Sequence, residues 1–299
     1  MPEAPATQRP GDVRSPDGHT PVRRGYVVYQ GVRSPYLEAG ERRHSEAAVF
    51  LHGNPGSAED WCDLLERVGA FTRAVAPTMP GYGQADKPKD FDYTVEGYAR
   101  HLDGILGHLG VQQAHLVLHD FGGPWGLAWA AAHPERLASV TLINIGLMPG
   151  YHWHSLARIW RTPVLGELFQ ASTTRFGFGL SLRRGNPRGL PKPFVDRMYR
   201  DMDRGTKRAV LRLYRATDDP GGMADALGET FRSLDVPALV IWGAADPYVP
   251  VRYAEQQRQF FPRARVVVLD QSGHWPFADD PDAVAAELVP FLRASVRQR

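Results

Sequence analysis

One short string near the middle of the chain combines a carboxylate with a pattern that exposes a reactive side chain. The string LVLHDFGG (residues 116–123) is an apolar run, then His119 and Asp120, then two glycines that open a predicted helix at residues 122–132, which is rich in small residues. A buried strand, one reactive residue and a glycine form the strand–turn–helix pattern of a nucleophile elbow. Gly122 supplies the small residue that so tight a turn needs. The string therefore predicts a nucleophilic Asp120, although aspartate is also a favoured helix cap.

An aspartate nucleophile restricts the chemistry. It is already ionised at pH 7, because the ordinary pKa of aspartate is about 4. Such a group suits displacement at a saturated carbon with a good or strained leaving group, and the product is an alkyl ester of Asp120. Water must then cleave this ester, and water needs a general base.

Two later strings supply a base and a carboxylate that could orient it. His274 lies in SGHWP (residues 272–276), and Asp246 lies in WGAADPYVP (residues 242–250). We expect Asp246 to fix the tautomer of the His274 ring and to stabilise its protonated form. Asp246 before a proline could also be a simple turn residue, and Asp270 is the nearest rival carboxylate.

The elements that would position these residues follow from short apolar runs. Uninterrupted apolar runs are typical of strands buried on both faces of a parallel sheet, and they occur here at residues 47–51, 73–76, 114–118, 137–145, 237–242 and 265–269. Residues 25–30 and 35–39 read as an antiparallel entry pair. Helical segments alternate with these runs. The sequence therefore predicts an α/β fold.

One region interrupts the alternation. Residues 147–234 contain no convincing strand, and the segments 193–203 and 206–216 have helical character. We expect a helical lid at 147–234, inserted after the sixth strand between the two parts of an α/β core, 25–146 and 235–299. Residues 1–24 lack the apolar core of a signal peptide and are expected to be a disordered lead-in.

These motifs resemble the Asp-nucleophile branch of the α/β-hydrolase superfamily, the epoxide hydrolases and haloalkane dehalogenases. HDFGG (residues 119–123) is similar to that branch's HDWGG, and HGNP (52–55) and PGYG (80–83) match its HGxP loop and PGYG turn. The resemblance runs from about residue 25 to the C-terminus and is weakest in the lid. It implies a mostly parallel eight-stranded sheet with helices on both faces. It also implies an oxyanion hole made by the backbone N–H groups of Asn54 and Phe121.

The resemblance does not decide which leaving group the enzyme expels. Our first prediction is the oxygen of an epoxide. Opening an epoxide creates an alkoxide, which needs a proton donor. Tyr214 in LYRA (residues 213–216) resembles the Tyr-Arg in which epoxide hydrolases carry one of two ring-opening tyrosines. GYHWH (150–154) supplies the predicted pocket residues Tyr151, His152, Trp153 and His154, of which Tyr151 and the two histidines are candidate second donors. Lid aromatics are expected to line an apolar pocket: Trp153, Trp160, Phe169, Phe176 and Phe178.

Our second prediction for the leaving group is a halide. Haloalkane dehalogenases often use the asparagine of HGNP as a halide donor, which favours Asn54. Their second donor is commonly a tryptophan after the nucleophile, where this chain has Phe121, so Trp153 or Trp160 would have to replace it. Fluoroacetate dehalogenases carry arginines just after the nucleophile, and GGPW (residues 122–125) has none. A β-lactone-processing enzyme and a non-catalytic ligand-sensing hydrolase fold also stay open, although such sensors usually keep a serine at the elbow.

Composition limits the other functions. The formal charge is +2 and no Lys/Arg cluster is dense, so we expect no nucleic-acid partner. No apolar stretch approaches roughly 18 residues, so we expect no membrane partner. The single cysteine, Cys62, fits a reducing compartment, and we expect a cytoplasmic protein. Without a metal-ligand cluster or a nucleotide fingerprint, no cofactor or metal is expected; the partners are an apolar small molecule and water.

Overall fold

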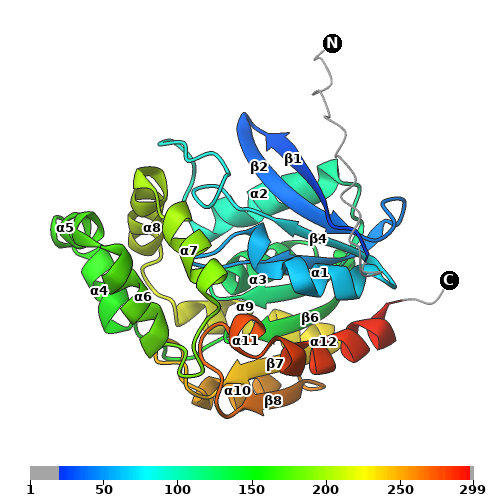
Figure 1. Cartoon of the computed structure of the whole chain (residues 1–299). Helices are drawn as coiled ribbons and strands as arrows, with labels where there is room; N and C mark the ends of the chain where they lie inside the picture. Colours follow the sequence, from blue (N-terminus) through cyan, green and yellow to red (C-terminus); the bar gives the residue numbers. More distant parts are fainter. Residues whose placement is uncertain (1–19, 297–299) are drawn as a thin grey trace.

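A mostly parallel sheet forms the centre of the chain (Figure 1). The computed structural model describes residues 20–296, so most of the predicted lead-in lies outside the described residues. The strands are β1 (Arg23–Tyr29), β2 (Val32–Ala39), β3 (Glu46–Leu51), β4 (Arg73–Pro77), β5 (Gln113–His119), β6 (Leu137–Ile143), β7 (Ala238–Gly243) and β8 (Arg265–Leu269). Their order is β1-β2-β4-β3-β5-β6-β7-β8, with β2 antiparallel to its neighbours β1 and β4 and the other pairs parallel. The predicted fold class is confirmed.

The burial of the strands follows their place in the sheet. Every residue of β3, β4 and β7 is buried, as expected for apolar runs with neighbours on all sides. The same expectation is wrong for β8, where Val268 is 39% exposed. Since β8 is an edge strand, it is covered less completely. The first strand begins at Arg23, which pairs with Glu38 of β2, so the last two residues of the predicted lead-in belong to the sheet.

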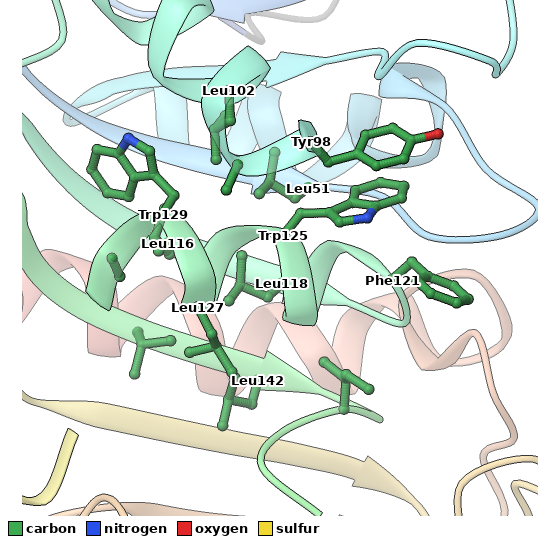
Figure 2. Close-up of a cluster of buried hydrophobic side chains, with 14 of the residues drawn as sticks. Leu51, Tyr98, Leu102, Leu116, Leu118, Phe121, Trp125, Leu127, Trp129 and Leu142 are labelled. Carbon is green, nitrogen blue, oxygen red and sulfur yellow. The ribbon is translucent and has the colours of Figure 1, made fainter. Parts of the chain in front are cut away.

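Helices cover both faces of the sheet and form two apolar cores. One core contains side chains of α2 (Val95–His108), α3 (Gly122–Ala132) and α10 (Arg252–Gln256); the other contains side chains of α1 (Cys62–Gly69), α11 (Pro276–Asp279) and α12 (Pro281–Ser295). Figure 2 shows part of the first core, where the rings of Tyr98 and Trp125 stack with centroids 4.2 Å apart. This contact fixes α3, and with it the start of the helix that follows Asp120.

Six helices lie between β6 and β7, where the lid is predicted (Figure 1). They are α4 (Ser155–Arg161), α5 (Leu165–Ser172), α6 (Arg175–Arg184), α7 (Lys192–Asp201), α8 (Arg204–Ala216) and α9 (Gly222–Leu234). The two segments predicted to be helical correspond to α7 and α8. α4 packs against α5 and α8, whereas α9 packs against α3 of the core. No helix of residues 20–296 is long and apolar enough to cross a membrane.

Candidate active site

Asp120 lies in a strained turn between β5 and α3. Its φ of 49° is in the left-handed region, which few residues other than glycine adopt. The turn brings the neighbouring backbone very close: a Cβ on Gly122 would lie 2.3 Å from the carbonyl oxygen of Leu51. A Cβ on Gly53 would lie 2.2 Å from Oδ1 of Asp120 itself. Both glycines are therefore required for the chain to hold Asp120 at this point.

The two carboxylate oxygens of Asp120 have different partners. Oδ1 accepts a hydrogen bond from the backbone N–H of Asn54 at 2.6 Å, and Oδ2 lies 3.5 Å from Nε2 of His274. Burial alone would raise the pKa of Asp120, but the hydrogen bond and charge of His274 outweigh burial and lower it to about 2. Asp120 is therefore an ionised carboxylate at neutral pH, as a nucleophile must be.

The backbone of His274 is fixed from two sides. Its N–H donates to the carbonyl oxygen of Gly185, at the end of α6, with a distance of 2.9 Å. Its carbonyl oxygen accepts a hydrogen bond from Nε2 of His119 at 2.7 Å. Its ring is fixed as well, because Nδ1 donates to Oδ2 of Asp246 at 2.7 Å. The structure thus brings Asp120, His274 and Asp246 together in the order that the sequence predicts.

The charge of the His274 ring depends on both carboxylates. Burial lowers the pKa of His274, but the negative charges of Asp246 and Asp120 outweigh it and raise the pKa to about 10. The resting site is therefore a cation between two anions. Removing the charge of either carboxylate would lower the pKa of His274.

Asp246 is held by more partners than the sequence indicates. Its Oδ1 accepts hydrogen bonds from the backbone N–H groups of Tyr248 at 2.7 Å and Val249 at 3.0 Å. Its Oδ2 accepts a hydrogen bond from Nδ2 of Asn144 at 2.8 Å, in addition to the hydrogen bond from His274. Sequence reasoning missed Asn144, although its position directly after β6 places it at the same edge of the sheet. The rival acid, Asp270, is exposed.

Two cavities meet at Asp120. The first, which we call the α5–α6 cavity, is about 340 Å³ and is lined largely by α5, α6 and the residues between them. The second, the α9 cavity, is about 440 Å³ and lies between α3, residues 145–154 and α9. Both are lined by Asp120, His154, Tyr214 and Tyr248. A substrate carbon placed at Asp120 could therefore carry a substituent into each cavity.

Tyr214 and His154 are the two predicted lid donors that reach both cavities. The Tyr214 hydroxyl accepts a hydrogen bond from Nδ2 of Asn54 at 3.3 Å, and burial raises its pKa well above 10. Nδ1 of His154 accepts the backbone N–H of Ala157 at 3.2 Å, and burial lowers the pKa of His154 to about 4. A neutral ring that accepts at Nδ1 must carry its proton at Nε2. Both side chains are therefore neutral donors at pH 7.

The other predicted pocket residues have different environments. Tyr151 lines the α9 cavity, but its hydroxyl already donates to the carbonyl oxygen of Tyr248 at 3.1 Å. Trp153 lines the same cavity and donates its indole N–H to Thr217 at 3.2 Å. His152 is exposed and lines neither cavity, so its assignment to the pocket is corrected. The residues before α4 turn this one side chain outward.

The apolar lid residues also divide into two groups. Trp160, Phe169 and Phe178 line the α5–α6 cavity as predicted. Phe176 does not, because it is 81% exposed on the outer side of α6. Phe121 directly follows Asp120, and its ring packs edge-on against Tyr214 with centroids 5.0 Å apart. That the backbone N–H group of Phe121 contributes to an oxyanion hole stays a prediction.

Known proteins share the fold of this chain. The model of the α/β hydrolase fold family matches residues 48–281. A haloalkane dehalogenase of Mesorhizobium japonicum is 33% identical over 86% of this chain and 87% of its own length. A cis-3-alkyl-4-alkyloxetan-2-one decarboxylase of Xanthomonas campestris is 29% identical over 89% of this chain and 93% of its own length. The solved structure of the epoxide hydrolase CorEH superposes with a TM-score of 0.77 at 17% identity, covering 91% of this chain and 99% of that one. The chain belongs to the α/β-hydrolase superfamily, and within it to the Asp-nucleophile branch that contains the haloalkane dehalogenases.

Proposed function

We propose that this hydrolase opens an epoxide through a covalent ester of Asp120. The observation that carries the proposal is the pair of neutral donors, Tyr214 and His154, that line both cavities together with Asp120. An epoxide is the leaving group that needs such donors, because its oxygen becomes an alkoxide when the ring opens.

In the first step the Asp120 carboxylate attacks a ring carbon. A C–O bond of the ring breaks as the ester bond forms, and the electron pair of the broken bond stays on the epoxide oxygen. The hydroxyl of Tyr214 donates its proton to that oxygen, and Nε2–H of His154 supports the developing charge by a hydrogen bond. The raised pKa of Tyr214 keeps it protonated until this moment.

In the second step water attacks the carbonyl carbon of the ester. Formation of the ester removes the negative charge of Asp120, so the pKa of His274 falls and its proton can pass through water to the Tyr214 phenolate. Neutral His274 then takes a proton from the attacking water. The backbone N–H of Asn54, which donates to Asp120 in the resting site, would stabilise the oxyanion. The ester C–O bond then breaks, and the leaving alkoxide takes the proton of the Asp120 carboxyl group. Release of the diol leaves Asp120 as a carboxylate and His274 protonated, as in the resting site.

The cavities favour a substrate with an apolar substituent on each ring carbon, since each cavity begins at Asp120. The oxetan-2-one of the Xanthomonas relative is also a strained oxygen ring with two alkyl substituents. An assay of this protein should therefore include a dialkyl epoxide and a dialkyl oxetan-2-one.

One observation favours a halide as the second candidate. The indole Nε1 of Trp160 is buried without a hydrogen-bond partner in the described chain, and Trp160 lines the α5–α6 cavity. Together with Nδ2 of Asn54 it offers two N–H donors of the kind that a departing halide needs. The Mesorhizobium haloalkane dehalogenase is a relative that fits this alternative.

Two matched substitutions separate the candidates. Tyr214→Phe removes only the hydroxyl, and Trp160→Phe removes the indole N–H with a modest loss of volume. We would measure kcat/KM of both variants with a dialkyl epoxide and with a 1-bromoalkane. The proposal expects Tyr214→Phe to lower epoxide turnover about 10²-fold or more and Trp160→Phe to change it little. If bromoalkane is the better substrate of the wild type, and Trp160→Phe is the variant that loses activity, the halide assignment replaces the epoxide one.

A further inference from the structure

Exposed apolar side chains are concentrated on two helices of the lid. Six of the eight large apolar side chains that are exposed in residues 20–296 lie on or beside α5 and α6. We call this set the α5–α6 face: Val164, Leu165, Leu168, Phe169, Phe176 and Leu180, whose exposed fractions range from 38% to 81%. Six such side chains within residues 164–180 are more than the single scattered ones that an ordinary surface carries, so this segment is a candidate interaction surface.

The mouth of the α5–α6 cavity lies within the same segment. Among the residues that line this cavity, those that are exposed are Phe169, Ser172, Thr174 and Gly177; the remaining lining residues are buried or half-buried. Phe169 thus belongs both to the cavity lining and to the α5–α6 face. A molecule that enters between the exposed lining residues therefore passes Phe169 of the α5–α6 face.

The charges of the segment indicate what covers it. Glu167 pairs with Arg215, and Arg175 pairs with Asp196. The other two charged residues between 164 and 184 are Arg183 and Arg184, which are exposed and have no acidic partner in the described chain. Two copies of the chain meeting through this segment would bring unpaired arginines together. Helices that combine exposed Phe and Leu with Arg are instead typical of binding to a lipid–water interface.

We propose that the α5–α6 face docks on an anionic lipid surface and that apolar substrate enters the α5–α6 cavity from that surface. Leu168 and Phe176 enter the apolar layer, and Arg183 and Arg184 contact anionic head groups. The sequence predicts no membrane partner because it has no spanning segment; peripheral docking needs none. Apolar substrates partition into lipid, so an entrance at the interface meets them at high local concentration.

The test is flotation of the full chain with lipid vesicles, which needs no turnover. Vesicles of equal parts phosphatidylcholine and phosphatidylglycerol would be compared with vesicles of phosphatidylcholine alone. We expect binding to the mixed vesicles to weaken at least about 30-fold in the double variant Leu168→Asp/Phe176→Asp, since two apolar insertions are lost. We expect Arg183→Gln/Arg184→Gln to weaken it about 30-fold and to abolish the preference for phosphatidylglycerol.

Val28→Asp is the matched control, because Val28 is an apolar residue on β1, away from the lid (Figure 1), and is 39% exposed. It should bind vesicles as the wild type does, and thermal unfolding would verify that each variant is folded. Failure of the wild type to float, or equal binding by Leu168→Asp/Phe176→Asp, would overturn the proposal. A second outcome would also overturn it: the wild type does not bind vesicles but forms a dimer, and these substitutions dissociate the dimer. That result would assign the α5–α6 face to contact with a second copy of the chain. Because flotation is independent of catalysis, its result stands whether or not the epoxide reaction is correct.

Discussion

The strand-end half of the site and the lid half are built differently. At the strand ends, Asp246 accepts four hydrogen bonds, and His274 is held through its ring, its N–H and its carbonyl oxygen. On the lid side, Tyr214 receives one long hydrogen bond from Asn54, and the indole N–H of Trp160 has no partner in the described chain.

This difference separates two tasks. In the proposed mechanism, the groups that make and cleave the ester must keep one geometry throughout, and dense hydrogen bonding at rigid strand ends preserves that geometry. The groups that stabilise the leaving group must have donor hydrogens available when the substrate arrives. Their donor hydrogens are therefore not committed to other protein groups. Substitutions in the strand-end half should therefore damage every reaction of the enzyme, whereas substitutions in the lid half should damage one leaving group and spare another.

Asp120→Asn should give the largest effect. It removes the charge and the proposed nucleophile, yet asparagine tolerates the left-handed conformation that φ of 49° imposes. We expect kcat to fall at least about 10⁴-fold on every substrate that the wild type turns over. Steady-state kinetics would measure it, with circular dichroism to verify folding. Substantial residual turnover would mean that another residue attacks.

Asp246→Asn should come next, with a loss of about 10³–10⁴-fold in kcat. The charge of Asp246 is the principal cause that raises the pKa of His274, so the amide should also shift the pH dependence of ester hydrolysis to lower pH. A pH–rate profile of single-turnover hydrolysis would detect the shift. An unchanged profile would remove Asp246 from the site and return attention to other carboxylates.

His154→Asn tests the lid half with a smaller expected effect. Asparagine is a good N-cap and can still accept the N–H of Ala157, so α4 keeps its start. The Nε2–H donor is lost. We expect about a tenfold loss of kcat on an epoxide and little change on a bromoalkane, measured side by side. Equal losses on both would mean that His154 shapes the cavity and donates no hydrogen bond to the leaving group.

The smallest effects should appear in the pH dependence of stability. Burial lowers the pKa of His52 to about 4 and that of His119 to about 3, against 6.5 in the unfolded chain. Both rings are neutral in the folded protein, so their contribution is complete above pH 6.5 and is lost as the pH falls toward these values. The raised pKa of His274 acts oppositely: its contribution is complete below pH 6.5 and is lost as the pH rises toward about 10. Urea denaturation across this range should give a maximum near neutral pH, and His119→Gln should flatten the acid side.

The sequence predicts the strand-end half well because its signals are local. The elbow string places Asp120, and the helix predicted at residues 122–132 is α3 with identical bounds. Three strand ends are enough to bring Asp120, Asp246 and His274 to one edge of the sheet. Asn144 was missed because an asparagine after a strand has no distinctive local pattern; its role appears only through Oδ2 of Asp246.

The lid was predicted less well because the direction of its side chains depends on tertiary packing. His152 and His154 are two residues apart in one short string, yet one is exposed and the other lines both cavities. Phe176 and Phe178 divide in the same way, with Phe176 outside and Phe178 buried. Since aromatic residues are equally suited to a pocket and to an interaction surface, composition could not separate the two cases.

The most direct test of the account is the intact mass of a His274→Gln variant after incubation with an epoxide that the wild type hydrolyses. Without its base the variant should attack but not release, so the covalent ester should accumulate. We predict a mass gain equal to the whole epoxide, because ring opening loses no atoms, and peptide mapping should place it on Asp120. A folded variant that gains no mass, or gains it at another residue, would contradict the assignment of Asp120 as the nucleophile.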